Sequence, residues 1–339
     1  MGIDIQTLDP YDDAAIDAIL RVQRAARAVD IPDFPPPCRD SFVGLVRHEV
    51  SFQRLETRVA RRHGEVVGYV QLALPLRDNT ENSEIELGVH PEHRRRGVGR
   101  ALYTHAVALL RDLGRKRTAG YTTEALPDGP ERPRAGSAFA EAMGAHRALG
   151  EVRRRLDLST ADTADYPKLL AAAWERATGY RLVQWRDRVP DAYAADVGYL
   201  DSRMVTDAPM GDLAWEPENI DVSRIRESEG ARAARQTRVY STGLVHERSG
   251  RLVAATALGI ERGNPWHAFQ WFTIVDPDHR GHRLGTVAKL ENLRYARTHE
   301  PDLRVIDTWN AAVNEHMISI NETMGFRAVD ATIAWQQEI

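Results

Sequence analysis

Two segments of the chain carry the same succession of residue types, and Arg280 in the second follows Arg94 in the first by 186 positions. In the first segment an apolar run ends at Val89, and a His-Pro-Glu-His turn leads through Arg94-Arg95-Arg96-Gly97-Val98-Gly99 into a helical pattern. In the second, Ile274-Val275 is followed by Asp-Pro-Asp-His and then by Arg280-Gly281-His282-Arg283-Leu284-Gly285. A repeat of this length indicates two similar folding units, each with its own apolar core.

Each segment reads as a strand-to-helix junction, and such a junction binds anions. The first backbone N–H groups of a helix have no partner inside the helix and point outward with the positive end of the helix dipole. Gly97 and Gly99 remove the Cβ atoms that would keep a phosphate at a distance. A three-glycine dinucleotide fingerprint and a Gly-Lys-Ser/Thr phosphate loop fit less well, because their remaining residues are missing. An arginine run that only starts a solvated helix is the other alternative.

The apolar spacing predicts the order β-α-α-β-β-β-α-β-α-β in the first half. The expected elements there are strand 3–8, helices 11–29 and 39–55, hairpin 58–60 with 66–74, strand 84–89, helix 97–113, strand 118–124, a surface insertion at 127–136, helix 139–143 and strand 152–158. The second half predicts helices within 166–177, hairpin 238–246 with 252–260, strand 268–275, helix 286–297 and strand 305–309. The predicted domains are 1–158 and 166–339, joined by a polar linker at 159–165.

At Arg94, Gly97 and Gly99 the chain resembles the GNAT superfamily of acyl-CoA-dependent N-acyltransferases, whose motif is Gln/Arg-x-x-Gly-x-Gly/Ala. In the second half Asn314, Gly325 and Phe326 match another pattern of this family, Asn-x-x-Ala-x-x-x-Tyr-x-x-x-Gly-Phe, while Met317 replaces its alanine and Asn321 its tyrosine. The resemblance implies an α/β fold (an α+β mixed sheet) of two tandem GNAT domains of the actinobacterial type. Each domain would be a mostly antiparallel twisted sheet with a splayed central strand pair flanked by helices.

The resemblance also implies acetyl-CoA as the cofactor, at one or both loops, and the first half either holds CoA or serves mainly as scaffold. The candidate cofactor-binding residues are Val89, Arg94, Arg95, Arg96, Gly97, Val98, Gly99 and Arg100 in the first half, and Ile274, Val275, Arg280, Gly281, His282, Arg283, Leu284, Gly285, Thr286, Asn310 and Asn314 in the second. Asn314 could hydrogen-bond the pantetheine arm or cap a helix, and the two roles are compatible. Arg283 stands where the first motif glycine belongs.

The second half is the better catalytic candidate. Asn321 stands where many GNAT enzymes have the tyrosine that protonates the departing thiolate, and its amide can hydrogen-bond developing negative charge without supplying a proton. The first half has Ala140 at this position. His267 is the titratable side chain best placed to act as general base on the amine, although a lone histidine is more often structural. Glu84 and Glu86 in the first half are alternatives.

Two further groups of residues have both a functional and a structural interpretation. His279 and His282 are spaced like metal ligands, but the loop register favours phosphate contact or solvation, so no metal is expected. Four tryptophans assigned to the second half either wall an acceptor pocket or pack the core, and they are Trp266, Trp271, Trp309 and Trp335. Acidic residues within 191–218 could attract a cationic amine.

Composition limits the partners. The 339 residues have a net charge of -4, which gives no support for a nucleic-acid partner. Cys38 is the only cysteine, so an intrachain disulfide is impossible. No apolar run approaches the roughly 18 residues of a membrane span, and a cytoplasmic monomer or homodimer is expected.

The expected reaction is transfer of acetyl to a primary amine of a small molecule. An aminoglycoside-like antibiotic and a thiol-cofactor precursor are the candidate acceptors, and tandem relatives of both kinds motivate them. A catalytically silent CoA-binding module is the alternative.

Overall fold

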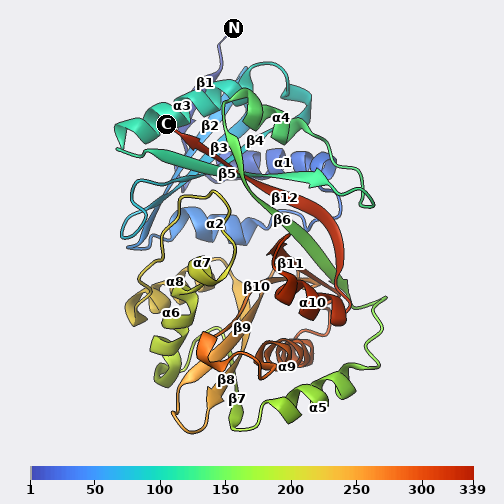
Figure 1. Ribbon diagram of the computed structural model, residues 1–339. Coiled ribbons are helices and arrows are strands. Elements are labelled where there is room, and N and C mark those ends of the chain that lie inside the picture. Colours follow the sequence, from blue (N-terminus) through green and yellow to red (C-terminus); the bar gives the residue numbers. More distant parts are fainter. Residues whose placement is uncertain (1) are drawn as a thin grey trace. The chain divides into compact units, whose positions relative to one another are not determined.

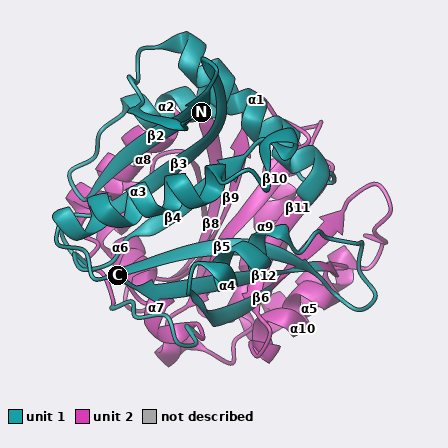
Figure 2. Cartoon of the chain, turned by 90° about the horizontal axis from the view of Figure 1, so that it is seen from above, with its two compact units in different colours: residues 1–151, 210–216, 330–339 teal, residues 152–209, 217–329 magenta. Residues whose placement is uncertain are grey.

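The structure is a computed structural model that describes residues 2–339 (Figure 1). The chain forms two compact units, which Figure 2 colours separately. Unit 1 comprises residues 1–151, 210–216 and 330–339, and unit 2 comprises residues 152–209 and 217–329. Residues 210–216 and 330–339, which the prediction places in the second domain, thus belong to unit 1. The predicted domain boundaries at 158 and 166 describe the two sequence repeats, and they stay a prediction.

Unit 1 is built on the strand order β1-β2-β3-β4-β5-β12. Neighbouring strands pair antiparallel, except that β4 and β5 are parallel. The strands are β1 (Asp4–Thr7), β2 (Gln53–Arg62), β3 (Glu65–Pro75), β4 (Glu84–Val89), β5 (Arg117–Ala125) and β12 (Arg327–Glu338), and the helices are α1 (Asp13–Asp30), α2 (Arg39–Arg47), η1 (Pro91–His93), α3 (Val98–Asp112) and α4 (Ala135–Ala142).

Helices cover both faces of the unit 1 sheet. The buried residues of α3 recur every four positions, which forms the single apolar stripe of an amphipathic helix; they are Val98, Leu102, Ala106 and Leu110. This stripe packs on Val70 and Leu72 of β3, whereas α1 packs on Tyr69. Since neighbouring residues of a strand point to opposite faces, α1 and α3 lie on opposite sides of the sheet.

Unit 2 is built on the order β6-β11-β10-β9-β8-β7. Its strands are β6 (His146–Asp157, of which residues from Val152 belong to unit 2), β7 (Tyr180–Arg186), β8 (Thr237–His246), β9 (Leu252–Glu261), β10 (His267–Val275) and β11 (Val305–Ala311). Its helices are α5 (Tyr166–Arg176), η2 (Asp191–Tyr193), α6 (Ala194–Ser202), α7 (Met204–Asp207), α8 (Val222–Ala234), η3 (Pro277–His279), α9 (Leu284–His299) and α10 (Glu315–Thr323). The strands β10 and β11 are parallel.

The two helical layers of unit 2 can be followed through the residues they bury. On one face α9 packs on Ala268 of β10 and Ile306 of β11, and on the other α6 and α8 pack against Ile274 of β10. The outer side of α9 is covered by Ala173 and Trp174 of α5. Consequently α9 is buried nearly all round, unlike the amphipathic α3.

Some expected elements differ from the structure. The helix predicted at 39–55 ends at Arg47, because residues from Gln53 pair with both β1 and β3 and tertiary pairing overrides local spacing. The strands β7 and β12 were not predicted. Trp335 lies on β12 in unit 1 and donates to Thr122 Oγ1 at 2.7 Å, so its assignment to the second half was wrong.

The predicted surface insertion at 127–136 contains a buried charge. Arg132 is nearly inaccessible, and its Nε donates to Asp330 Oδ2 at 2.9 Å. Its Nη2 pairs with Asp33. Arg132 therefore holds the end of the chain against the α1–α2 connection within unit 1.

This buried pair gives a stability prediction. Asp330→Asn should lower the free energy of unfolding by about 3 kcal/mol, because removing one partner leaves Arg132 buried with incomplete charge compensation. Denaturant unfolding measures the change. The matched surface variant Asp165→Asn removes the exposed pair with Lys168 and should change stability little. Equal effects of the two variants would contradict the prediction.

Candidate active site

The junction of β4 and α3 holds a row of backbone N–H groups open. Arg95 and Gly97 have left-handed φ values of 60° and 83°. Ala101 makes the first hydrogen bond of the helix, to the carbonyl of Gly97 at 3.0 Å. Among the described residues nothing accepts from the N–H groups of residues 95–100. Such a row at a helix N-terminus is an anion site.

The junction of β10 and α9 has the same backbone. Gly281 and Arg283 are left-handed, with φ values of 85° and 54°, and Val287 makes the first helical bond to Arg283. The N–H groups of residues 281–286 have no acceptor within the described chain. Glycine and arginine have exchanged places between the two left-handed positions of the two loops. The loop shape is therefore retained although Arg283 replaces the motif glycine.

The first arginine of each loop supports the loop instead of projecting from it. Arg94 forms a two-pronged ion pair with Asp30, at 2.8 and 2.6 Å, and its Nε donates to Val89 O at 3.2 Å. In unit 2, Arg280 pairs with Asp207 at 2.8 Å. Its Nε likewise donates to the carbonyl of the last residue of β10, Val275, at 3.4 Å.

The exposed cations of each loop are other arginines. Arg95, Arg96 and Arg100 project from the unit 1 loop, and no ion pair of theirs occurs among the described residues. In unit 2 Arg283 is exposed and has no ion pair among the described residues, and Arg280 is also exposed but pairs with Asp207. His282 Nδ1 lies 3.3 Å from the carbonyl of Arg176. A phosphate at either loop would thus meet backbone N–H groups and exposed guanidinium groups.

The remaining loop residues serve packing. Val98, Leu284 and Ile274 are buried in the cores, and Thr286 lies in the first turn of α9. A Cβ on Gly99 would lie 3.2 Å from Phe139 of α4, and one on Gly285 would lie 3.5 Å from Ile320 of α10. The second motif glycine thus allows two helices to approach in each unit.

A parted strand pair lies beside the unit 2 loop. β10 pairs with β11 from His267 to Phe269 and with no later residue. At this point a β-bulge in β10 shifts the register with β9 between Gln270 and Phe272. Gly259 leaves room for the indole of Trp271, since a Cβ there would lie 2.2 Å from the ring. Bulges of this kind commonly occur next to active sites.

The corresponding strands of unit 1 lack the bulge. β4 pairs with β3 in unbroken register from Gly68↔Val89 to Ala73↔Glu84. It meets β5 at Glu84↔Ala119. Both units therefore have a parallel pair that separates, and the bulge occurs in unit 2.

The structure brings Asn310 and Asn321 together. Asn321 is fully buried on α10, and its Nδ2 donates to Asn310 Oδ1 at 2.6 Å. The Oδ1 atom of Asn321 has no partner within residues 2–339. Asn314 caps α10, because its Oδ1 accepts from the N–H of Met317 at 3.3 Å. The N-cap interpretation of Asn314 thus holds, and its Nδ2 remains available to a ligand.

Sequence comparison identifies the family to which these two junctions belong. The profile of the Acetyltransferase (GNAT) family matches residues 24–126 and 209–326, one copy over each junction. The chain is a member of the GNAT acetyltransferase family. As a tandem GNAT N-acetyltransferase it uses acetyl-CoA as the acetyl donor.

Relatives of full length support the tandem arrangement. A mycothiol acetyltransferase of Saccharomonospora viridis is 27% identical over 97% of both chains. One of Mycolicibacterium vanbaalenii is 35% identical over 121 residues, which is 36% of its length. A solved tandem GNAT protein from the clavulanic acid biosynthesis pathway is 35% identical and covers 99% of this chain and 98% of its own, with a TM-score of 0.85. A GCN5-related N-acetyltransferase from Sphaerobacter thermophilus shares the fold, at 13% identity, 99% and 95% coverage and a TM-score of 0.66.

His267 lies apart from Asn321. It is 1% exposed, and its Nε2 lies 2.9 Å from Asp307 Oδ2. Burial alone raises the pKa of Asp307, but hydrogen bonds from Arg155 and His267 and the charges of Arg155 and Arg153 lower it to about 2. Asp307 and Asn310 point to opposite faces of β11, so the two predicted catalytic side chains lie on opposite faces as well. The role of His267 as general base stays a prediction.

The alternative general bases in unit 1, Glu84 and Glu86, each accept a hydrogen bond from a tyrosine. Tyr69 donates to Glu86 at 2.5 Å, and Tyr121 donates to Glu84 at 3.3 Å. Burial, followed by the charge of Glu84, raises the pKa of Tyr121 well above its ordinary value. These carboxylates are thus anchored to the sheet of unit 1.

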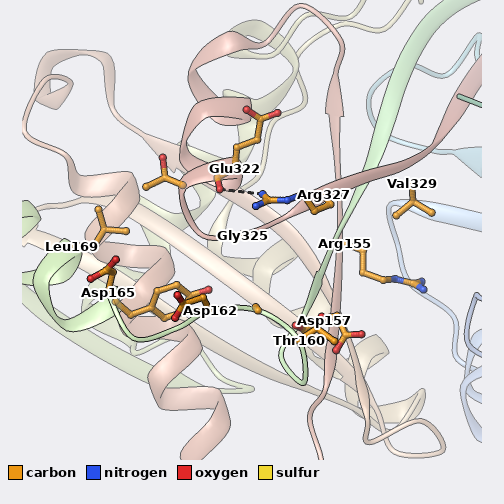
Figure 3. Close-up of a pocket in the computed structure, with 13 residues that line it drawn as sticks. Arg155, Asp157, Thr160, Asp162, Asp165, Leu169, Glu322, Gly325, Arg327 and Val329 are labelled. Carbon is orange, nitrogen blue, oxygen red and sulfur yellow. Dashed lines mark hydrogen bonds between the residues drawn. The ribbon is translucent and has the colours of Figure 1, made fainter. Parts of the chain in front are cut away.

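A cavity of about 790 Å³ lies in unit 2 between the predicted linker, α5 and the end of α10 (Figure 3). The predicted site residues do not line it. Its acidic residues have local roles: Asp157 accepts from Ser159, Asp162 from Ala164, and Asp165 pairs with Lys168. The acidic side chains of this cavity therefore make turn and helix-end contacts.

Sequence reasoning missed Lys289, which lies four residues after Gly285 on α9. Its side chain is 2% exposed, and its Nζ has no partner among residues 2–339. Burial lowers the pKa of Lys289 to about 7. A lysine inside a buried helix was the available signal. The partners Asp30 and Asp207 were also missed, because they are distant in sequence and no local motif marks them.

Metal sites and membrane spans are two further possibilities. In the described part of the chain, no three histidine, cysteine or carboxylate side chains are arranged to hold a metal ion. No helix of these residues is long and apolar enough to cross a membrane.

The exchanged loop residues give a matched pair of predictions. Arg283→Gly should raise the free energy of unfolding by about 1 kcal/mol, because a non-glycine residue at positive φ is strained by roughly 1–2 kcal/mol. Gly97→Ala should lower it by a similar amount, since an added Cβ meets no atom within 4 Å and only the backbone strain remains. Urea unfolding of both variants tests this, and changes of the same sign would contradict it.

Proposed function

We propose that unit 2 catalyses transfer of acetyl from acetyl-CoA to a primary amine of a small molecule, by direct attack and without a covalent enzyme intermediate. The parting of β10 from β11, with the bulge at Trp271, carries this proposal. Bound acetyl-CoA supplies the thioester carbonyl that the amine attacks. The residues of unit 2 bind the donor, orient it and exclude water from the reacting atoms.

The donor would be held from the loop to the end of α10. The N–H groups of residues 281–286 would bind the diphosphate, and Asn314 Nδ2 would donate to the pantetheine arm. Asn310 orients Asn321 through its hydrogen bond. A buried polar atom without a partner costs about 1–3 kcal/mol, so the free Oδ1 of Asn321 fits a site that a polar ligand completes.

Unit 1 would bind acetyl-CoA without catalysing transfer. Its loop keeps the motif glycines, and residues 95–100 present the same free N–H groups as unit 2. It has no bulge on β4, and Ala140 offers no polar side chain at the position of Asn321.

The acceptor would lie on the opposite face of the parted strands. Phe269 and Trp309 stack there with ring centroids 6.1 Å apart. Trp271 is 37% exposed, and Arg232 lies over its ring at 5.5 Å. Flat aromatic surfaces of this kind pack against sugar rings or alkyl amines.

Two acceptor classes remain candidates. The mycothiol acetyltransferases of two actinobacterial relatives favour a thiol-cofactor precursor with a free amine. An aminoglycoside-like antibiotic is the second candidate.

Amine-stimulated release of CoA thiol tests the function directly. The protein is incubated with acetyl-CoA and a panel of amino sugars, cysteinyl glycosides and aminoglycosides, and free thiol is measured over time. At least one amine should accelerate thiol release and appear as its N-acetyl product. Binding of acetyl-CoA without accelerated release for any amine would favour the catalytically silent module.

Substitution of Asn321 and substitution of Asn314 should change different kinetic parameters. Asn321→Ala should lower kcat on the order of 100-fold with little change in KM for acetyl-CoA, because oriented donors near developing charge act in the transition state. Asn314→Ala should raise that KM, because its partner is the cofactor arm in the ground state. Steady-state kinetics separate the two. Loss of activity in Glu84→Gln or Glu86→Gln, with both asparagine variants active, would move the chemistry to unit 1.

The number of donor sites is a separate prediction. Gly99→Asp introduces negative charge beside the unit 1 loop and should reduce the acetyl-CoA stoichiometry from two to one without loss of activity. Gly285→Asp should have the same effect on stoichiometry and abolish activity. Isothermal titration counts the sites. An unchanged stoichiometry in Gly99→Asp would mean that unit 1 binds no acetyl-CoA.

A further inference from the structure

Lys289 is a buried lysine without an acidic partner. The chain has 45 lysine and arginine residues, and the lysines are Lys116, Lys168 and Lys289. Lys116 and Lys168 are exposed and pair with Glu81 and Asp165. The Nζ atom of Lys289 lies 5.0 Å from the ring centroid of Phe326 and has no hydrogen bond within residues 2–339.

Lys289 faces the contact between α9 and α10. Residues four apart share one face of a helix, so Lys289 lies on the same face as Gly285. Gly285 borders Ile320 of α10, and Phe326 follows the end of that helix. The side chain of Lys289 therefore lies between α9 and the α10 end, where the predicted path of the cofactor leaves the loop.

Unit 1 supports this placement through the equivalent residues. Tyr103 follows Gly99 by four positions, as Lys289 follows Gly285. Gly99 borders Phe139 of α4, and the ring of Tyr103 packs edge-on against Phe139 with centroids 5.9 Å apart. In both units this face of the helix therefore borders the helix that carries the family's tyrosine position.

The polar groups where α3 meets α4 in unit 1 and where α9 meets α10 in unit 2 differ in whether they have hydrogen-bond partners. In unit 1 the hydroxyl of Tyr103 bonds to Gln337, and Ala140 has no polar side chain. In unit 2 Lys289 Nζ and Asn321 Oδ1 are both buried without partners. Phe326 neighbours both residues, because its N–H donates to the backbone carbonyl of Asn321 at 3.0 Å and its ring lies beside Lys289 Nζ. Around Phe326, unit 2 thus has a buried donor and a buried acceptor without partners among residues 2–339.

The charges around Lys289 are engaged elsewhere. On α9, Glu291 accepts from Trp174 and pairs with Arg294. On β11, Asp307 points to the face away from α9 and is held by Arg155. On the other packed elements, Arg154 of β6 interacts with Glu322 of α10, Glu315 is exposed, and Tyr166 of α5 donates to Met324 O. None of these carboxylates compensates Lys289, which agrees with its lowered pKa.

We propose that Lys289 donates the proton that the departing CoA sulfur takes up in unit 2, in place of the tyrosine that many family members have at position 321. The proposal rests on the proposed function of unit 2. As the amine nitrogen bonds to the carbonyl carbon, the carbon–sulfur bond breaks and its electron pair stays on sulfur. The Lys289 ammonium gives sulfur a proton and becomes neutral. The proton lost by the amine passes to solvent, and solvent reprotonates Lys289.

A lysine suits this role better than the arginine that the chain otherwise uses. An arginine keeps its proton at neutral pH, whereas a buried lysine both gives and regains one near pH 7. Asn321 cannot supply a proton, but its amide can orient the sulfur or the acetyl oxygen. The two residues together would replace the hydroxyl of a single tyrosine.

Lys289→Met is the decisive variant, because methionine fills similar space without charge. Its folding is tested first. Below about pH 7 the folded wild type must hold a buried charge, and this destabilisation disappears as pH rises toward the ordinary pKa of lysine. Lys289→Met should therefore raise Tm more at pH 6 than at pH 9. A Tm below that of the wild type at pH 6 would show that Lys289 stabilises the fold through a partner and would count against the proposal.

A binding measurement tests whether Lys289 lies beside the sulfur of bound CoA, and it needs no acceptor amine. In the Gly99→Asp background, CoA bound to unit 2 is titrated with pH, and the absorbance of its thiolate is followed. With Lys289 present, bound thiol should ionise about one pH unit lower or more than in Lys289→Met, because an ammonium nearby favours thiolate. Identical titrations would refute the proposal. Tyr103→Phe, the equivalent change in unit 1, should leave the titration unchanged.

Activity measurements test the proton transfer itself. Lys289→Met should lower kcat on the order of 100-fold with an unchanged KM for acetyl-CoA, and the loss of wild-type kcat at alkaline pH should vanish. The defect should shrink with the selenium analogue of acetyl-CoA, because a selenolate leaves without a proton. A wild-type kcat in Lys289→Met would overturn the inference about Lys289 and leave the proposed function of unit 2 standing. A wild type that binds acetyl-CoA yet acetylates no amine would refute the proposed function, and the thiol titration would still decide the contact.

Discussion

A row of backbone N–H groups without acceptors at the start of a helix is the feature on which each unit depends. It requires two left-handed residues between strand and helix, and the chain supplies them as Arg95 and Gly97 or as Gly281 and Arg283. The loop is then fixed at both ends. An arginine clamps the last carbonyl of the strand and pairs with a distant aspartate, while the buried stripe of the helix holds the other end. Because the anion meets backbone atoms, this site tolerates sequence change as long as the loop keeps its shape.

The two units show what happens when binding and chemistry are under different constraints. Binding a diphosphate needs a backbone conformation, and both loops retain it. Transfer also needs a parted strand pair, a bulge that re-aims residues of β10, and polar side chains at the contact between α9 and α10. Unit 2 has all three features, and it leaves Lys289 Nζ and Asn321 Oδ1 without partners among residues 2–339, whereas in unit 1 the Tyr103 hydroxyl is hydrogen-bonded to Gln337. Polar side chains that hydrogen-bond each other stabilise the fold, whereas buried polar atoms without a partner can bind a ligand.

The sequence predicted what depends on local patterns. The repeat and the strand–turn–helix segments at both loops were confirmed, because Gly, Pro and apolar spacing determine such a segment locally. The tandem GNAT fold and the acetyl-CoA donor, which the family resemblance implied, were confirmed as well. It did not predict that residues 210–216 and 330–339 belong to unit 1, since the pairing of β12 with β5 joins segments about two hundred positions apart. The buried pair of Arg132 with Asp330 and the ion pairs of Arg94 and Arg280 were missed for the same reason. Lys289 was missed because motif comparison examines the positions that a family shares, and its role depends on a contact between two helices.

The alternation of side chains along β11 separates the tasks of the proposed reaction. Asp307 and Trp309 point to the face where His267 and Phe269 lie, and Asn310 points to the face of α9 and α10, where it holds Asn321. In a direct transfer the amine approaches one side of the carbonyl carbon while sulfur leaves on another. A gap between two parted strands opens to both faces of the sheet, so the amine and the sulfur can each contact a different layer of side chains. The aromatic face can then change with the acceptor, while in the proposed reaction Lys289 and Asn321 serve a leaving group that is the same for every acceptor.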